Sequence, residues 1–372
     1  MASLMPTMYH FVADFFVSFL NPLGPYFVER FQVSPRLMAM TISAISTTSA
    51  FTQIFFGGLS DRITLKNLYM FVCILITVVA SMFIGFSSGL LLLTLVFMAI
   101  FLANAAFHPM GAAVAGEKGS TSLVIFSFSG SMATAVGPIF ITSFVEKLGI
   151  GKVWLVGMIA LITTAILGST SLFQRFPSVK KRKFKLHEFK PLIGIWILVT
   201  FRSFAVSVMH IFGPMYTRLL GYEITFGGLL LSTGLTIGTF ANFLGARMSN
   251  RVDYRLLNAI SFGGMTFAIF MFSHVTSFYP LLVFFVLLDI FMFLTMAANT
   301  HYAQSMFPSS RGLASAVAMG LSWATGSALN FVYSSIFGKD VYLAIKLMGP
   351  ITLAGTVITL IAFLKSRASR ST

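Results

Sequence analysis

Three charged residues lie deep within long apolar stretches of the sequence, where a charge is costly. They are Asp14, Arg202 and Asp289. An ion in hydrocarbon loses its hydration, so such a residue usually faces a cavity or a partner of opposite charge. A carboxyl group in that setting can take up and release a proton, and a guanidinium group can attract an anion. We therefore expect proton exchange at Asp14 or Asp289 and anion binding at Arg202, with a fixed Arg202–aspartate ion pair as the structural alternative.

The three charges are predicted to lie at a similar depth. A helix rises about 1.5 Å per residue, which places each charge roughly 15 to 16 Å from the nearer end of its apolar stretch. The hydrocarbon core of a bilayer is about 30 Å thick, so all three fall near its midplane. Coincident depth on three separate stretches favours a shared role over packing alone.

Other polar residues extend this candidate site. On a helical wheel, His10 and Asn21 fall within about 40° of Asp14, which gives the first stretch one polar face. We assign His10 to proton coupling together with the two aspartates. The residues predicted to contact a substrate are Arg202, Asn21, His210, Asn104 and Asn299.

Two further histidines occupy roughly equivalent positions in the two halves of the chain. His108 and His301 lie near the predicted cytoplasmic ends of their stretches, where we expect them at a gate. A hydrogen-bonded packing role is the alternative for both. His108 also precedes Pro109, a pair that fits a kink where the helix leaves the membrane.

The composition identifies the elements that must position these residues. Mean hydropathy is +0.90, 57% of residues are hydrophobic and only 9% are charged, whereas soluble domains carry about a quarter charged residues. Residues 71–107 contain no Asp, Glu, Lys or Arg. Such runs exceed the roughly 20 apolar residues that cross a bilayer. The sequence therefore predicts an all-α polytopic membrane protein.

Apolar stretches separated by short polar breaks give twelve predicted spans. They are 5–28, 36–58, 68–87, 90–115, 122–144, 152–173, 192–217, 225–246, 256–273, 279–303, 312–336 and 342–364. With both termini in the cytoplasm, seventeen Lys and Arg fall in cytoplasmic segments and seven outside. This asymmetry favours cytoplasmic termini in an inner membrane by the positive-inside rule.

Composition and motifs also exclude several function classes. A net charge of +15 would suggest nucleic acid in a soluble chain, but here the basic residues cluster in loops, as membrane topology requires. Cys73 is the only cysteine, so neither an intrachain disulfide nor a cysteine metal site can form. No zinc-ligand spacing, nucleophile elbow or phosphate-binding GxxxxGK[ST] loop is present. We expect no enzyme activity, no cofactor and no metal.

The same landmarks occur twice, 189 residues apart. Gly24-Pro25 recurs as Gly213-Pro214, and the segment 58–63 recurs at 247–252. Internal duplication in an apolar chain is typical of transporters whose halves move around a central site. We predict an N-terminal six-helix bundle over 1–173, a basic cytoplasmic linker over 174–191 and a C-terminal six-helix bundle over 192–372. The two bundles would be related by a pseudo-two-fold axis.

The segment Gly57-Gly58-Leu59-Ser60-Asp61-Arg62, followed by Lys66, resembles the loop signature of the major facilitator superfamily between its second and third helices. Thr64 and Leu65 depart from that signature, where the family usually has a glycine and a basic residue. The resemblance implies a latch that closes the cytoplasmic side. The expected gate residues are Gly57, Asp61, Arg62, Lys66, Asn250, Arg251, His108 and His301.

Shorter motifs resemble the fosmidomycin-resistance-type exporters of that superfamily. They are His10 and Asp14 ahead of Asn21-Pro22, then Phe107-His108-Pro109, Gly130 with Gly137-Pro138, Arg202-Ser203 and Gly213-Pro214. The resemblance implies proton-driven export of a small organic molecule or drug.

The resulting prediction is a monomeric secondary transporter that works in the lipid bilayer by alternating access and exchanges protons for a small organic solute. The first, fourth, seventh and tenth spans would line its cavity, and Gly234 and Gly238 would allow close packing of the eighth. A proton symporter for a small anionic metabolite is the alternative, because the same Asp–Arg set serves either direction. A membrane receptor or scaffold is disfavoured because the sequence offers no extramembrane domain for signalling.

Overall fold

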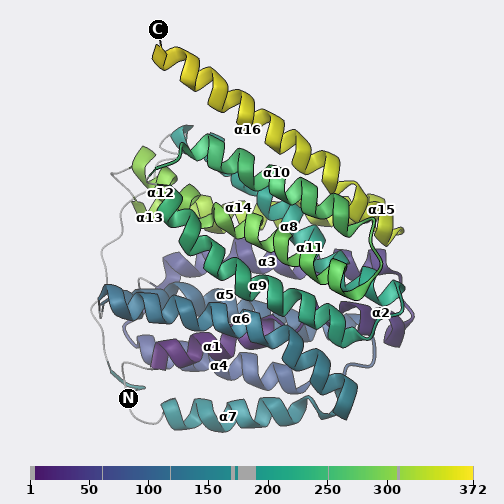
Figure 1. Ribbon diagram of the computed structural model, residues 1–372. Helices are drawn as coiled ribbons and strands as arrows, with labels where there is room; N and C mark the ends of the chain where they lie inside the picture. The colour runs from purple at the N-terminus through teal and green to yellow at the C-terminus, as the bar shows by residue number, and fades with distance from the viewer. Residues whose placement is uncertain are drawn as a thin grey trace. The chain divides into compact units, whose positions relative to one another are not determined.

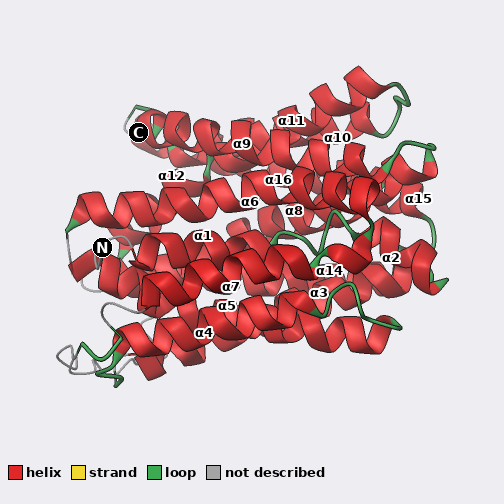
Figure 2. Ribbon diagram, turned by 90° about the horizontal axis from the view of Figure 1, so that it is seen from below, coloured by secondary structure: helices red, strands yellow, loops and turns green. Residues whose placement is uncertain are grey.

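The computed structural model is helical throughout the residues it describes, which are 5–60, 62–117, 119–168, 172–174, 190–249, 251–307 and 311–371. No strand occurs among them (Figure 2). The predicted linker over 174–191 lies almost wholly outside the described residues, as do Asp61, Lys118 and Asn250.

Each of the twelve predicted spans corresponds to one helix or to consecutive helical pieces (Figure 1). Seven spans are single helices: α3 (Pro35–Ser60), α4 (Lys66–Met82), α5 (Leu90–Glu117), α6 (Ser120–Leu148), α8 (Ile193–Leu219), α9 (Ile224–Met248) and α10 (Tyr254–Phe272). The other five are built from pieces: α1 (Met5–Val17) with α2 (Gly24–Phe31), η1 (Ile150–Lys152) with α7 (Trp154–Gly168), α11 (Phe278–Leu294) with α12 (Met296–Met306), α13 (Arg311–Ser315) with the π-helical η4 (Ala316–Leu321) and α14 (Ser322–Phe337), and α15 (Val341–Lys346) with α16 (Met348–Ser371).

Within the described residues, eight helical stretches are long and apolar enough to cross a membrane, and Lys66–Met82 is a shorter apolar helix. The prediction of an all-α polytopic membrane protein is confirmed.

The first predicted span is interrupted rather than continuous. Residues 18–23 form a series of turns between α1 and α2. Pro22 lacks the N–H that a continuing helix would need, and Pro25 occupies the first turn of α2, where its fixed φ is favourable. Asn21 lies in this break, so it leaves the helical face that it was predicted to share with Asp14.

The tenth span is interrupted at Thr295, between α11 and α12. Asn242 of α9 partly compensates, because its side-chain oxygen accepts a hydrogen bond from the Ala297 N–H at 2.9 Å. A helix end leaves its last carbonyl groups without helical donors. The break therefore leaves carbonyl groups of α11 available as acceptors inside the bundle. One of them accepts a hydrogen bond from Arg202.

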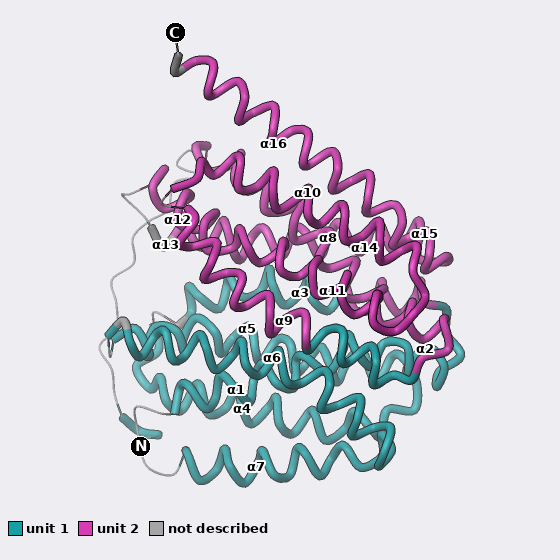
Figure 3. The backbone as a smooth tube through the Cα atoms, in the orientation of Figure 1, with its two compact units in different colours: residues 1–34, 44–183, 223–232 teal, residues 35–43, 184–222, 233–372 magenta. Residues whose placement is uncertain are grey.

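Residue contacts divide the chain into two compact units (Figure 3). Unit 1 comprises residues 1–34, 44–183 and 223–232, and unit 2 comprises 35–43, 184–222 and 233–372. In unit 1, α1 packs against α5 and α6, and α4 packs against α5 and α7. In unit 2, α8 packs against α14, while α10 packs against α11 and α16. In unit 1, polar side chains of α1 and α5 meet on the face that these two helices share.

Candidate functional site

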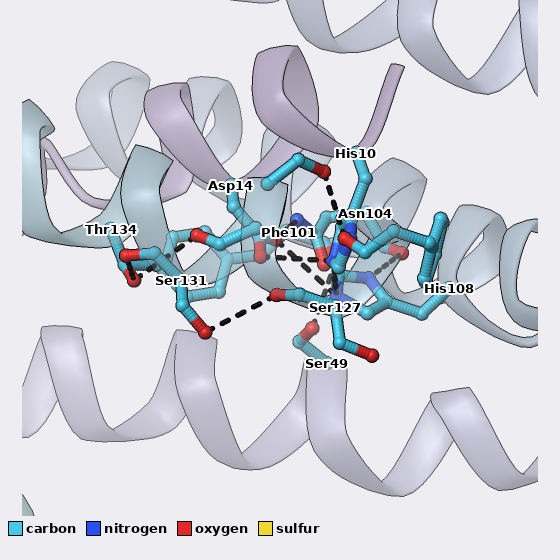
Figure 4. Close-up of polar contacts among 12 residues, drawn as sticks. His10, Asp14, Ser49, Phe101, Asn104, His108, Ser127, Ser131 and Thr134 are labelled. Carbon is cyan, nitrogen blue, oxygen red and sulfur yellow. Dashed lines mark hydrogen bonds and ion pairs between the residues drawn. The ribbon is translucent and has the colours of Figure 1, made fainter. Parts of the chain in front are cut away.

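Unit 1 contains a cluster of polar side chains, called here the His–Asp cluster, formed by His10 and Asp14 of α1 and by Asn104 and His108 of α5 (Figure 4). Each helix contributes an i, i+4 pair, so both of its side chains point to the same face. His10 Nε2 lies 3.1 Å from Asp14 Oδ2, and His108 Nε2 lies 3.3 Å from Asp14 Oδ1. Asn104 Nδ2 donates to Asp14 Oδ1 at 2.8 Å. The packing of α1 on α5 thus surrounds one carboxylate with two imidazoles and an amide.

Backbone carbonyls orient both imidazoles of the cluster. His10 Nδ1 lies 2.7 Å from the Phe126 carbonyl oxygen, and His108 Nδ1 lies 3.0 Å from the Asn104 carbonyl oxygen. A carbonyl only accepts, so the hydrogen-bond network assigns a proton to each Nδ1 and directs each Nε2 toward Asp14.

The two Nε2 atoms are also in contact with each other, at 3.1 Å. With both Nδ1 atoms already protonated, a hydrogen bond between the Nε2 atoms requires a second proton on one ring. That ring is then an imidazolium, and the Asp14 carboxylate balances its charge. The geometry of the cluster therefore accommodates one additional proton.

A small metal cation is a second chemical possibility for this set. The ligand atoms of His10, Asp14 and His108 lie within 4.8 Å of one another. Within the described part of the chain, however, no fourth His, Cys, Asp or Glu joins the group. One additional proton supplies the donor for the contact between the two Nε2 atoms and needs no fourth ligand, so the arrangement favours proton storage.

Helix α6 supplies two cluster residues whose contribution the sequence did not reveal. Phe126 provides the carbonyl for His10, and its ring stacks on the His10 imidazole at a centroid distance of 4.0 Å. Gly130 lies directly against the charged groups, since a Cβ there would sit 2.5 Å from His10 Nε2 and 2.6 Å from Asp14 Oδ2. Only glycine leaves room for the cluster. The sequence indicated Gly130 only through its resemblance to the exporters, and the structure gives the physical reason for a glycine there.

His108 contacts the polar groups of α1 from within α5. The sequence predicted it near the cytoplasmic end of the span 90–115, with a kink at Pro109 as one interpretation of the His-Pro pair. Helix α5 continues through Pro109 to Glu117. Prolines are tolerated inside membrane helices because neighbouring groups satisfy the freed carbonyls. His108 thus belongs to the His–Asp cluster.

Unit 2 holds a second carboxylate–imidazole pair, Asp289 of α11 and His210 of α8. His210 Nε2 lies 2.8 Å from Asp289 Oδ1, and Asp289 is fully buried. Asp289 Oδ2 has no hydrogen-bond partner among the described residues. It rests against Gly234 of α9, where a Cβ would lie 3.0 Å from the Asp289 carboxyl carbon. The glycines of α9 therefore allow close approach, as expected.

The guanidinium group of Arg202 (α8) binds a backbone carbonyl at the end of a helix and not a carboxylate. It is 2% exposed, and its Nη1 donates to the Met292 carbonyl oxygen at 2.8 Å. That carbonyl belongs to the last turn of α11, just before the break at Thr295, where the negative end of the helix dipole favours a cation. The described residues form no ion pair with Arg202, so the alternative of a fixed Arg202–aspartate pair is not found there. Its Nε has no partner in that part of the chain either.

The predicted asparagines differ in their surroundings. Asn299 is buried and exchanges two hydrogen bonds with Asn258 of α10, at 2.7 and 3.0 Å. This amide pair satisfies its own polar atoms and joins α10 to α12. Asn104 belongs to the His–Asp cluster, and Asn21 is partly exposed in the break between α1 and α2.

The predicted gate residues fall into two groups. In unit 1, Gly57 of α3 faces Pro109 of α5, and the buried Lys66 forms an ion pair with Glu117 at the end of α5. Arg62 is exposed. In unit 2, Arg251 and His301 are exposed and line a shared polar cavity. Asp61 and Asn250 lie outside the described residues. The sequence missed Glu117 because it lies at the far end of another span.

Removing one member of the Lys66–Glu117 pair is expected to lower the stability of unit 1. Lys66→Met leaves Glu117 unpaired, but Glu117 is 41% exposed, so solvent screening limits the loss to about 1–2 kcal/mol. The measurement is the apparent melting temperature of Lys66→Met, Glu117→Gln and the double variant in detergent. The double variant should lose less than the sum of the single losses; strictly additive losses would show that the pair contributes nothing.

Comparison with known proteins decides the family. The sequence profile of the Major Facilitator Superfamily matches residues 7–331. The chain belongs to the major facilitator superfamily. It is therefore a membrane transporter and not an enzyme. Both the His–Asp cluster and the Asp289–His210 pair lie inside the matched region. A search of curated protein sequences finds no match.

Solved structures of other transporters share the fold. A bacterial homologue of the human lysosomal transporter Spinster, in an inward-facing and occupied conformation, has a TM-score of 0.74 at 15% identity, covering 98% of this chain and 96% of that one. The nucleoside transporter NupG has a TM-score of 0.80 at 11% identity, with 97% and 98% covered. A POT family transporter in complex with 5-aminolevulinic acid has a TM-score of 0.79 at 12% identity, with 97% and 95% covered. At these identities the likeness extends to the fold alone.

Proposed function

We propose that this transporter exports a small organic solute or drug in exchange for protons, by alternating access. The observation that supports proton coupling best is the His–Asp cluster. Its two Nε2 atoms and one carboxylate converge within hydrogen-bond distance, and the contact between the Nε2 atoms becomes a hydrogen bond when the set holds one additional proton. Without that proton the carboxylate carries an uncompensated charge inside an apolar bundle, which is costly. Proton loss is therefore favoured only when water or a substrate reaches the cluster.

The resemblance to fosmidomycin-resistance-type exporters supports the direction of transport. The residues that carry it are not scattered in unit 1: His10, Asp14 and His108 meet in the cluster, and Gly130 makes room for them. A set of short motifs that converges on one polar centre is better explained by shared chemistry than by chance. Drug efflux is the activity we infer from it.

In unit 2, the substrate is proposed to contact two buried polar atoms. Arg202 Nε and Asp289 Oδ2 are buried polar atoms without partners among the described residues, so a ligand that reaches them would satisfy both. His210, Asn21 and Asn104 are also proposed as substrate contacts. Asn299 would have to break its amide pair with Asn258 to take part, which makes it the weakest of the proposed contacts.

The alternative is a proton symporter that takes up a small anionic metabolite. One observation favours it: Arg202 is a buried cation that no described carboxylate neutralises. An anionic substrate group could take that position. One experiment, described below, distinguishes export from uptake.

Orientation and assembly complete the proposal. We propose an inner-membrane location with both termini in the cytoplasm, from the bias of Lys and Arg, and a monomer as the working unit. In this orientation Gly57, Asp61, Arg62 and Lys66, with Asn250, Arg251 and His301 in the second half, would form the cytoplasmic gate.

A measurement of luminal pH in proteoliposomes distinguishes proton antiport from proton symport. A panel of growth inhibitors that includes fosmidomycin is first screened for the compound that raises the melting temperature most, because a ligand that binds only the folded state stabilises it. Liposomes are then loaded with that compound and a pH-sensitive dye, with the membrane potential clamped. Outward flow of the compound should acidify the lumen if protons are exchanged for it. Alkalinisation would indicate symport, and compound efflux without any pH change would contradict proton coupling.

A further inference from the structure

Unit 2 contains an elongated apolar cavity, called here the α16 groove, between α8, α10, α12 and α16. Its volume is about 450 Å³. The walls are almost entirely apolar and include Phe201 of α8 and Ile358 of α16, which are 46% and 67% exposed. Groove and open surface are therefore continuous, and a ligand could enter from the side. The positions of α10 and α16 in unit 2 can be followed in Figure 1.

The length of the groove matches one leaflet of a bilayer. Along α16 its lining runs from Ile351 to Ala362, which is roughly 16 Å at 1.5 Å per residue. Half of the hydrocarbon thickness of a bilayer is about 15 Å. A single acyl chain from one leaflet would fill such a groove from end to end.

One end of the groove is marked by aromatic and basic side chains. Tyr254 and Tyr302 stack with a centroid separation of 3.5 Å, and the Arg255 guanidinium lies 4.8 Å from the Tyr254 ring. Arg255 Nη1 also donates to Ser366 Oγ at 2.9 Å, which fixes it beside α16. Tyrosines and arginines are characteristic of the membrane–water interface. We therefore expect this end of the groove to lie in the headgroup region of the bilayer.

A second, polar cavity of about 410 Å³ continues from the same end. It shares Tyr254 and Tyr302 with the groove and is lined by Arg251 and His301. Asp253 is its one acidic lining residue, and that carboxylate lies 3.4 Å from Arg255 Nη1. Lys190, at the start of the segment that leads into α8, and Lys365, in the last two turns of α16, are exposed. The apolar α16 groove thus adjoins a polar cavity with excess positive charge, and Tyr254 and Tyr302 line both of them.

We propose that this pair of cavities binds one anionic phospholipid, with an acyl chain in the α16 groove and the headgroup beside Arg255 and Arg251. The lipid is a resident ligand of unit 2, distinct from the transported solute, and it would hold α16 against α8 and α10. Basic pockets between membrane helices commonly recognise anionic headgroups, each cation contributing modestly. This inference does not depend on the direction or the coupling of transport.

Native mass spectrometry of the full chain after delipidation tests the proposal. The protein is incubated with phosphatidylglycerol or phosphatidylcholine of the same acyl chains, and the fraction carrying one lipid is counted. Phosphatidylglycerol should bind about fivefold more tightly, the effect of roughly one cation near the headgroup. Equal binding of the two lipids would overturn the charge assignment.

Two sets of matched variants test the position of the lipid. Gly194 of α8 lines the groove, and a Cβ there has nothing within 4 Å, so Gly194→Phe can fill the slot without displacing its walls. It should lose most bound lipid of either kind, whereas Gly194→Ala should retain it. Arg255→Gln should lose the preference for phosphatidylglycerol but keep acyl binding, and Arg218→Gln, at the other end of α8, should keep both.

Melting temperature and gel-filtration profile show that each variant is folded before lipids are counted. Unchanged lipid occupancy in a folded Gly194→Phe would overturn the proposal. Displacement of the lipid by the transported compound would also overturn it, because the groove would then belong to the substrate path.

Discussion

Asp14→Asn is expected to abolish proton-driven transport while leaving the protein folded. Asparagine has almost the same volume as aspartate and can still meet His10, His108 and Asn104, so the packing of α1 on α5 is preserved. It carries no negative charge to balance an imidazolium, and the additional proton of the cluster is no longer stabilised. The measurement is transport of the selected compound into or out of proteoliposomes with and without a proton gradient.

Any residual flux through the Asp14→Asn variant should be insensitive to the gradient. The matched control is Asp340→Asn, which changes an exposed carboxylate that caps α15 through the Leu343 N–H at 2.9 Å. This control should transport like the unmodified protein. Gradient-driven flux that survives in Asp14→Asn would remove the His–Asp cluster from the coupling mechanism.

Gly130→Val should cause a loss of transport of tenfold or more, although residue 130 carries no chemistry itself. A side chain at this position overlaps His10 Nε2 and Asp14 Oδ2, so the imidazole and the carboxylate must separate. Overpacked sites in a dense interior force such displacements instead of tolerating the extra atoms. Transport per molecule of reconstituted protein is the quantity to measure, because the substitution can also lower expression.

Gly116→Val provides the control for this steric prediction. Gly116 lies near the end of α5 in unit 1, and a Cβ there has nothing within 4 Å. Both variants replace a helical glycine with the same β-branched residue, so a change in helix propensity alone would affect both in the same direction. If Gly130→Val transports as well as Gly116→Val, the tight contact between α6 and the cluster is not required for function.

Hydropathy and charge spacing predicted the fold because they depend on local sequence. A membrane span needs only a long enough apolar run, and the twelve runs are separated by charged or turn-forming residues. The end of α4 shows the limit of this reasoning. Phe83, Ile84 and Phe86 continue the apolar run, yet the helix ends at Met82, because Gly85 packs against the Ile150 backbone in the turn that follows.

The sequence indicated several residues of the candidate site, but not which of them contact one another. Asp14 and His10 share a helical face, which sequence reveals, whereas their meeting with His108 depends on how α1 packs on α5. Arg202 was expected to find a carboxylate or an anion. The structure gives it the Met292 carbonyl, because α11 breaks at Thr295, although residues 281–307 contain neither glycine nor proline. Tertiary contacts, which one sequence does not display, decided both outcomes.

The most direct test of proton exchange at the His–Asp cluster is proton release on substrate binding. Purified transporter in weakly buffered detergent is mixed with the selected compound, and the change in bulk pH is compared with the amount bound. Antiport coupling at the cluster predicts release of about one proton per bound molecule, the single extra proton that its contacts accommodate, and none from Asp14→Asn. No release from the unmodified protein, or equal release from the two, would contradict the account.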